Sequence, residues 1–368
     1  ETPIPLVSQE PIAGSRQAIG TLANCAGGVT PWGSVLTCEE NYQDFYGENH
    51  RHEDGRTVWQ PSASYLMWEK VYKNPPEHYG WVVEVNPLSG TAKKLTALGR
   101  FSHECATVRE GSDGRVVVYS GDDANDECLY KFIADTPGSL ETGELFVADT
   151  KRGRWVSLSW KKNKELQNLF RNQTETLIHT RLAARTLGGT PLDRPEDIEV
   201  DPHTGAVIVA LTNNKPKGNF HGSLLKIEEK DNDPFALEFE ASEFLLGGQE
   251  SGFSCPDNLV FDRQGHLWMT SDISGGSLGH RPYRPFGNNG LFYIPMSGPN
   301  AGGVFQMASA PNEAEFTGPC FSKDGKTLFL SVQHPGEKTK DLNKPTSQWP
   351  SGKAQLPKPS VIAIQMTS

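Results

Sequence analysis

The sequence lacks several features that would place it in a common class of protein. Its 368 residues include six cysteines, but no CxxC pair and no zinc-finger spacing. No apolar run approaches the length that crosses a membrane. With a formal net charge of −10, the chain also has no basic surplus of the kind that nucleic-acid binders carry. We therefore expect neither a membrane protein nor a nucleic-acid-binding protein.

Helical periodicity is scarce as well. The chain is instead rich in Gly (37 residues) and Pro (26 residues), and short apolar stretches alternate with turns. This pattern favours many short strands joined by turns over a helical fold.

A strand-turn-strand unit recurs five times along the chain. The first covers residues 24–41 and reads NCAGGVTPWGSVLTCEEN. Each turn carries a glycine, the expected residue where φ must be positive. The five turn glycines are Gly33, Gly114, Gly205, Gly265 and Gly325. Because further apolar strands follow each unit, the pattern predicts an all-β fold, a β-propeller of five or six blades, with a β-sandwich as the alternative. We expect one propeller domain over residues 1–368.

Two segments interrupt this pattern. Residues 161–188 place leucines and a phenylalanine at helical spacing, which predicts one or two amphipathic helices inserted between blades. Residues 42–61, rich in charge and histidine, are a second expected elaboration.

Polar residues occupy one register of the repeat. Counting back eight to ten positions from the first four turn glycines gives Cys25, Glu104, Glu196 and Asp257. The first strand of each propeller blade lines the central channel, so these side chains would converge there. Taken singly, each has an ordinary structural explanation: a buried thiol, a surface acid or a turn cap.

Three carboxylates and a thiol on one axis would repel one another and resist burial unless cations compensate them. Carboxylates suit Ca²⁺ or ferric iron, whereas a thiolate needs a softer or transition metal. The register therefore predicts a metal centre that holds more than one kind of metal.

Three further residues are candidates for the same site. Glu39 and Glu40 follow the strand that pairs with the Cys25 strand, and the strand period of two lets only one of them face the channel. Arg194, two residues before Glu196, suits a phosphate or carboxylate held at two points, with a salt bridge to Asp193 or Asp197 as the alternative. No Ser/His/Asp arrangement is apparent.

Six ordered motifs between about residues 20 and 340 resemble the PhoX-type alkaline phosphatases. They are NCAGGVTPWGSVLTCEEN, RFSHECATV, VYSGDDANDECLYKF, RPEDIEVDP, FSCPDNLVFD and GPCFSKDGKTLFLSVQHPGE. The resemblance implies a β-propeller whose channel holds two ferric ions and two or three calcium ions around a bridging oxo group. It also implies hydrolysis of small-molecule phosphate monoesters, with release of inorganic phosphate.

The resemblance also implies roles for individual residues. It implies metal ligation by Cys25, Glu104, Glu196 and Asp257, and phosphate contacts by Arg194 and Asn41. Glu39 and Glu40 stay candidate ligands from their strand position. The chain looks shorter than the longer members of this family, whose extra loops could supply ligands that are missing here.

The family is typically exported folded by the twin-arginine route, although the sequence as given contains no such signal. We therefore expect a periplasmic or secreted monomer that acts on small phosphate esters. Two other functions stay open: a calcium-dependent lactonase or esterase, and a non-catalytic propeller that binds partners on its faces.

Overall fold

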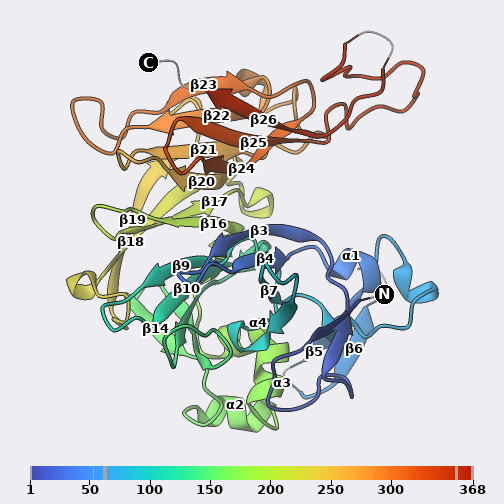
Figure 1. Cartoon of the computed structure of the whole chain (residues 1–368), viewed down its shortest axis with the longest axis vertical. Helices are drawn as coiled ribbons and strands as arrows, with labels where there is room; N and C mark the ends of the chain where they lie inside the picture. The colour runs from blue at the N-terminus through green and yellow to red at the C-terminus, as the bar shows by residue number, and fades with distance from the viewer. Residues whose placement is uncertain (1, 53, 61–63, 353–354, 366–368) are drawn as a thin grey trace. The chain divides into compact units, whose positions relative to one another are not determined.

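A computed structural model of the protein describes residues 2–52, 54–60, 64–352 and 355–365 (Figure 1). The chain divides into two compact units. Unit 1 comprises residues 1–196 and 228–241, and unit 2 comprises residues 197–227 and 242–368. Each unit has a hydrophobic core of its own. That residues 1–368 form one domain stays a prediction, and the terminal residues 1 and 366–368 lie outside the described residues.

Two larger antiparallel sheets lie within unit 1, and the strands of each are adjacent in the sheet in the order in which they occur along the chain. The first sheet contains β3 (Asn24–Val29), β4 (Val35–Glu39), β7 (Val82–Val85) and β8 (Ala92–Leu95). The second contains β9 (Thr107–Glu110), β10 (Val116–Gly121), β12 (Leu129–Ala134), β13 (Gly143–Asp149) and β14 (Arg154–Ser157).

The remaining three sheets follow in chain order with the same layout. The third contains β16 (Pro195–Val200), β17 (Val207–Leu211), β18 (Ser223–Glu229) and β19 (Phe239–Leu246). The fourth contains β20 (Pro256–Phe261), β21 (Leu267–Ser271), β22 (Gly290–Ile294) and β23 (Phe305–Ser309). The fifth contains β24 (Glu315–Phe321), β25 (Thr327–Gln333) and β26 (Ser360–Gln365).

These five sheets are the blades that the repeat predicted. All five turn glycines have positive φ, between 73° and 83°, as the turns require. The all-β propeller class is confirmed, and the described part of the chain forms five blades, which decides between the five and six that the sequence left open.

The predicted helical insertion lies between β14 and β16 and consists of three short helices, α2 (Lys164–Leu169), α3 (Gln173–Ile178) and α4 (Thr180–Thr186). Helix α3 begins after Asn172, whose side chain accepts a hydrogen bond from the Glu175 amide. Leu166 and Leu182 are buried in the core that the first two sheets also form. The insertion is thus packed into unit 1, as its apolar spacing required.

Smaller elements complete the chain. The 42–61 elaboration forms α1 (Gln43–Tyr46), β5 (Glu48–Arg51) and β6 (Thr57–Gln60), while residues 53 and 61 lie outside the described residues. Two more pairs are β1 (Pro3–Pro5) with β2 (Gln17–Ile19) and β11 (Asn125–Glu127) with β15 (Leu192–Asp193). Within the described residues, the 3-10 helices are η2 (Trp68–Lys70), η3 (Pro76–His78), η4 (Thr96–Leu98), η5 (Lys215–Lys217), η6 (Lys230–Asn232) and η7 (Arg284–Phe286).

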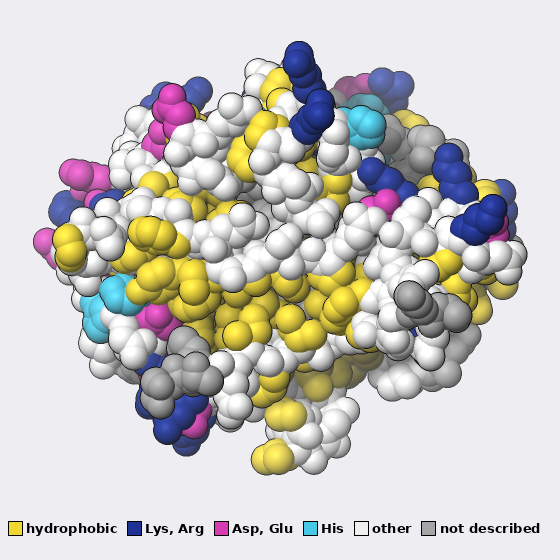
Figure 2. Space-filling model, turned by 90° about the horizontal axis from the view of Figure 1, so that it is seen from above, with side chains coloured by type: hydrophobic (Ala, Val, Ile, Leu, Met, Phe, Trp, Pro, Cys, Tyr) yellow, Lys and Arg dark blue, Asp and Glu magenta, His cyan; other side chains and the backbone are white. Residues whose placement is uncertain are grey.

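Hydrophobic side chains gather in a band across the face that is seen from above in Figure 2. The exposed large apolar side chains of β23, β25 and β26 are Phe305, Met307, Phe329 and Val361. Among the described residues no helix is long and apolar enough to span a membrane.

Candidate metal centre

The glycine pair in β3 lets this strand approach the loop that follows the first blade. A Cβ on Gly28 would clash with the carbonyl oxygen of Ala106, and the Ala106 amide donates a hydrogen bond to the Gly27 carbonyl at 3.3 Å. Only glycine fits such a close backbone approach. The approach places Cys25 beside Glu104: the thiol sulfur lies 2.9 Å from Glu104 Oε2.

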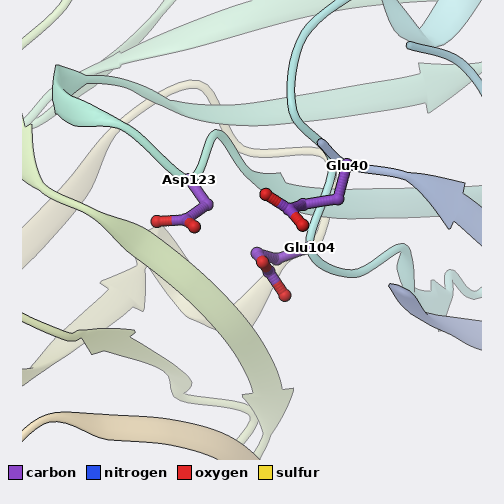
Figure 3. A group of neighbouring side chains, drawn as sticks. All are labelled: Glu40, Glu104 and Asp123. Carbon is purple, nitrogen blue, oxygen red and sulfur yellow. The ribbon is translucent and has the colours of Figure 1, made fainter. Parts of the chain in front are cut away.

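Three carboxylates of unit 1 converge at this point. Glu40 directly follows β4, Glu104 lies before β9, and Asp123 follows β10. One carboxylate oxygen of each lies within 4.8 Å of the others. Figure 3 shows the three side chains lying together, each on a different segment of the chain. Oxygen ligands from several chain segments at such spacing are typical of a site for a hard cation.

Burial makes this arrangement costly without a cation. Burial, together with the Asp123 carboxylate, raises the pKa of Glu40 well above its ordinary value. Burial, together with Glu40 and Glu196, does the same to the pKa of Glu104. Glu40 Oε1 is buried and has no hydrogen-bond partner among the described residues. A cation bound here would satisfy this buried carboxylate oxygen and would offset the negative charges of the neighbouring acids.

One cation of the protein does reach the cluster. The Arg194 guanidinium donates two hydrogen bonds to the Asp123 carboxylate, with Nε 2.7 Å from Oδ1 and Nη2 2.8 Å from Oδ2. Its Nη2 also lies 2.7 Å from Glu196 Oε1. The alternative that the sequence offered, a salt bridge from Arg194 to Asp193 or Asp197, stays a prediction. A single guanidinium offsets only part of the charge of four carboxylates.

The backbone is strained at Arg194. Arg194 has a φ of 55°, in the left-handed region that residues other than glycine rarely adopt. The residue before it is held in a strand pair, because Asn125 of β11 pairs with Asp193 of β15. Gly121 at the end of β10 allows the same close approach, since a Cβ there would clash with the carbonyl oxygens of Pro195 and Glu196.

Glu39 lies outside the cluster. Its Oε1 accepts hydrogen bonds from the Leu22 amide (3.0 Å) and Lys94 Nζ (2.7 Å). Its Oε2 accepts from the amides of Gly80 (3.0 Å) and Trp81 (3.1 Å). Both charged side chains of the Glu39–Lys94 pair are fully buried. Four donors thus occupy Glu39, and the structure brings Glu40 rather than Glu39 to the other acids.

A second layer of contacts holds the strand ends that carry the cluster. Asp122, the neighbour of Asp123, accepts two hydrogen bonds from Arg181 of α4, at 2.8 and 2.5 Å, and one from the Ser102 amide at 3.2 Å. His103, beside Glu104, is completely buried, with Nε2 2.9 Å from the Gly99 carbonyl oxygen. Burial lowers the pKa of His103 to about 3, so the ring is neutral. The helical insertion therefore supports the site through Arg181.

The other predicted residues lie as follows. Asn41 is exposed and donates a hydrogen bond to Glu40 Oε2. Cys38, which pairs with Cys25 across β3 and β4, is buried in the apolar core of unit 1. Asp257 belongs to unit 2, where it is buried at the start of β20 and accepts a hydrogen bond from the Asn258 side chain at 3.0 Å. Its part in the metal centre stays a prediction.

These residues suit a cluster of hard and softer metals. Buried carboxylates that face one another, an unsatisfied oxygen on Glu40 and a thiol on Cys25 together form a mixed oxygen and sulfur donor set. Calcium takes the oxygen donors, and iron accepts both types.

Comparison with protein families gives the decisive observation. A family model described as alkaline phosphatase PhoX matches residues 7–336. The chain belongs to the PhoX family of alkaline phosphatases. As a PhoX-family protein it is a phosphatase, which sets aside the lactonase and the non-catalytic propeller that the sequence left open.

A solved structure agrees with this membership. The structure of Pseudomonas fluorescens PhoX in complex with vanadate, a transition state analogue, is similar with a TM-score of 0.84 and 30% sequence identity. The match covers 99% of this chain and 74% of that one. Pseudomonas aeruginosa periplasmic gluconolactonase PpgL matches at 12% identity over 83% of this chain and 64% of its own, with a TM-score of 0.38, too low to carry an argument. No curated protein sequence matches the chain.

Sequence reasoning missed one acid of this PhoX-family site as a ligand. Asp123 directly contacts Arg194 and faces Glu40 and Glu104, yet the repeat register of the first strands does not include it. A signal was present, because Asp123 follows the second strand of its blade just as Glu40 follows β4. Two adjacent acids occur at both strand ends, and only the fold decides which of each pair turns inward.

Proposed function

We propose that this PhoX-family phosphatase hydrolyses phosphate monoesters at the acidic cluster of unit 1, with iron and calcium bound there. The observation that carries the proposal is the convergence of Glu40, Glu104 and Asp123, together with a buried oxygen of Glu40 that has no hydrogen-bond partner among the described residues. Among the described residues, Arg194 compensates only part of this charge.

The residues that would hold the metals are those that the structure brings together: Cys25, Glu40, Glu104, Asp123 and Glu196. Asp257 joins them from the sequence register and the family resemblance, and we leave Glu39 out because four donors already occupy it. We propose ferric iron beside the Cys25 thiolate and calcium among the carboxylates, with a bridging oxo group as the family resemblance implies. Bound cations would stabilise the negative charge that develops on the phosphoryl group as it is transferred.

Arg194 and Asn41 are the groups that we propose for binding the phosphate. Arg194 holds a planar fork of donors at the cluster, and its side chain is 24% exposed, so a ligand can reach it. Asn41 is exposed and is anchored through Glu40, which would orient its amide toward the same site. The relative from P. fluorescens was solved with vanadate, a transition state analogue, and we propose that the same class of oxyanion binds here.

The positions of these donors are fixed before any ligand arrives. The Arg194 guanidinium is fixed by Asp123, Glu196 and the strained backbone, while Asp122 is held by Arg181. Donors that are already in place need not be reordered during the reaction, which is how an active site lowers a barrier electrostatically. We further propose a monomer that is exported to the periplasm or secreted, where small phosphate esters are its substrates.

The test is elemental analysis of the purified protein together with a p-nitrophenyl phosphate assay, with and without added Ca²⁺. We expect bound iron and calcium, turnover that depends on Ca²⁺, and loss of both metal and turnover in Glu196→Gln. Glu238→Gln, which changes an exposed acid paired with Lys230, is the matched control and should behave as the wild type. Full activity of Glu196→Gln without bound metal would contradict the proposal.

A further inference from the structure

A long loop of unit 2 forms a pocket that the proposed reaction does not use. It joins β21 to β22 and contains η7. Asn289 holds both ends of the loop: its side chain accepts from the Ile273 amide at 2.6 Å and donates to the Ile273 carbonyl at 3.1 Å. Ile273, Leu278 and Tyr283 of the loop are buried together with Cys255. The loop is therefore anchored by packing and hydrogen bonds.

Two arginines of this loop are left without partners. Arg281 and Arg284 are exposed, and neither makes an ion pair or a side-chain hydrogen bond within the described part of the chain. By contrast, Arg194 and Arg181 each have a carboxylate oxygen within 4 Å of a guanidinium nitrogen. In a chain with a net charge of −10, two exposed arginines that line one cavity, with no acidic partner among the described residues, make this region locally basic.

Both arginines line a cavity of about 650 Å³, together with His221, Gln249 and two prolines. None of these lining residues is acidic, and Glu250, next to Gln249 in the chain, forms no ion pair among the described residues. His221 Nδ1 lies 2.9 Å from Ser254 Oγ, which leaves its Nε2 available to a ligand. Lys215 contributes a further positive charge nearby, with Nζ 3.3 Å from Ser277 Oγ and 5.4 Å from the centre of the Tyr283 ring.

A second cavity adjoins the first. It has a volume of about 200 Å³ and shares Gln249 with the arginine pocket. Its walls include the apolar side chains of Ile273, Phe286 and Phe292 and the amide of Asn288. The Phe286 ring is fixed against His221, with the ring centres 5.3 Å apart. The walls of this second cavity are thus partly apolar and partly polar, and such a cavity beside positively charged side chains can bind a small organic anion.

We propose that this pocket, lined by His221, Gln249, Arg281, Arg284 and Phe286, binds a small organic molecule through its phosphate group. Two guanidiniums match a phosphate dianion in charge and can each donate two parallel hydrogen bonds to its oxygens. The organic part of the ligand lies in the cavity beside Phe286. The proposal concerns residues of unit 2 alone and does not depend on the phosphatase site.

The test measures binding of phenylphosphonate, whose carbon–phosphorus bond the proposed reaction does not cleave, by titration calorimetry. The metal-loaded full chain carries Arg194→Gln, so that binding at the catalytic cluster is weakened in every sample. Adding Arg281→Gln and Arg284→Gln should weaken the remaining binding at least tenfold. Adding Arg263→Gln instead, an exposed arginine of unit 2 that donates to the Asp324 carbonyl, should leave it unchanged. Equal binding with and without Arg281 and Arg284 would overturn the proposal.

Two further arms test the chemistry of the ligand. Phe286→Ala should weaken phenylphosphonate binding about fivefold or more and leave inorganic phosphate binding unchanged; no effect on phenylphosphonate would overturn the place given to the organic part. Benzoate should bind at least tenfold more weakly than phenylphosphonate, and equal binding would overturn the assignment of phosphate. Since each comparison is made between variants that share Arg194→Gln, failure of the proposed phosphatase site would not alter its outcome.

Discussion

Glu39 and Glu40 are adjacent acids in one motif, and the structure predicts opposite consequences when each is changed to glutamine. Glu39 accepts four hydrogen bonds and pairs with the fully buried Lys94. Glu40 faces Glu104 and Asp123 and has an oxygen without a partner among the described residues. The substitutions have the same size and remove the same charge, so each serves as the control for the other.

The expected magnitude for Glu39→Gln follows from the partner that is left behind. Burial lowers the pKa of Lys94, and Glu39 is the group that offsets this effect. Removing one member of a buried ion pair leaves the other charge uncompensated and costs about 3–5 kcal/mol. We expect the free energy of unfolding to fall by about this amount, while the metal content of the folded protein stays as in the wild type.

Glu40→Gln should do the reverse. Burial and the neighbouring Asp123 raise the pKa of Glu40, so its charge opposes folding in the metal-free protein. Without metal, the free energy of unfolding should therefore be unchanged or higher in this variant. Metal retention and turnover should be lost, because the variant lacks the carboxylate that we propose as a ligand.

Urea unfolding of the metal-free proteins, elemental analysis of the purified proteins and p-nitrophenyl phosphate turnover separate the two outcomes. The reasoning would be refuted if Glu39→Gln lost its metal at unchanged stability, or if Glu40→Gln kept its metal and its turnover. Lys94→Met provides a check on the buried pair, since it should destabilise the protein by a similar amount to Glu39→Gln.

Three more predictions follow from single contacts. Gly28→Ala should displace β3 from Ala106, lower turnover and reduce the free energy of unfolding by about 1–3 kcal/mol. Gly276→Ala is the control, because there is open space around Gly276. Equal behaviour of the two variants would contradict the close approach of β3 to Ala106. Arg194→Lys keeps the positive charge but cannot donate two parallel hydrogen bonds, so kcat/KM should fall at least tenfold. Wild-type kinetics of this variant would count against the proposed phosphate contact. Burial raises the pKa of Glu127 from 4.5 to about 7, so its contribution to stability is fully present below pH 4.5 and is lost as the pH rises to about 7. Denaturation from pH 4.5 to 8 should show a loss of stability that is larger in the wild type than in Glu127→Gln, by an amount on the order of 3 kcal/mol.

The fold was predictable because the repeat depends on residues that are close together in the sequence. Each blade has a turn that needs a glycine at positive φ, flanked by apolar strands, and all five of these glycines adopt that conformation. The helical insertion was visible from its spacing, although it forms three short helices rather than one or two. Its breaks fall at Phe170 and His179, the C-cap residues of α2 and α3.

The site was predictable only in part. The repeat register and the family resemblance led to Cys25 and Glu104, which lie in contact, and to Arg194 with Glu196, which form an ion pair. The sequence could not choose between Glu39 and Glu40, because the choice depends on Lys94, which is distant in the chain and buried beside one of them. Asp123 was missed for the same reason, since its role depends on a strand end that Arg181 of the helical insertion fixes through Asp122.

The central claim is that metal binds among Cys25, Glu40, Glu104 and Asp123 of unit 1. Anomalous diffraction from crystals of the purified protein, collected on both sides of the iron absorption edge, tests this most directly. We expect an iron peak within bonding distance of the Cys25 sulfur and of at least one of the three carboxylates. A peak elsewhere in the molecule, or no peak from crystals of protein that hydrolyses p-nitrophenyl phosphate, would contradict it.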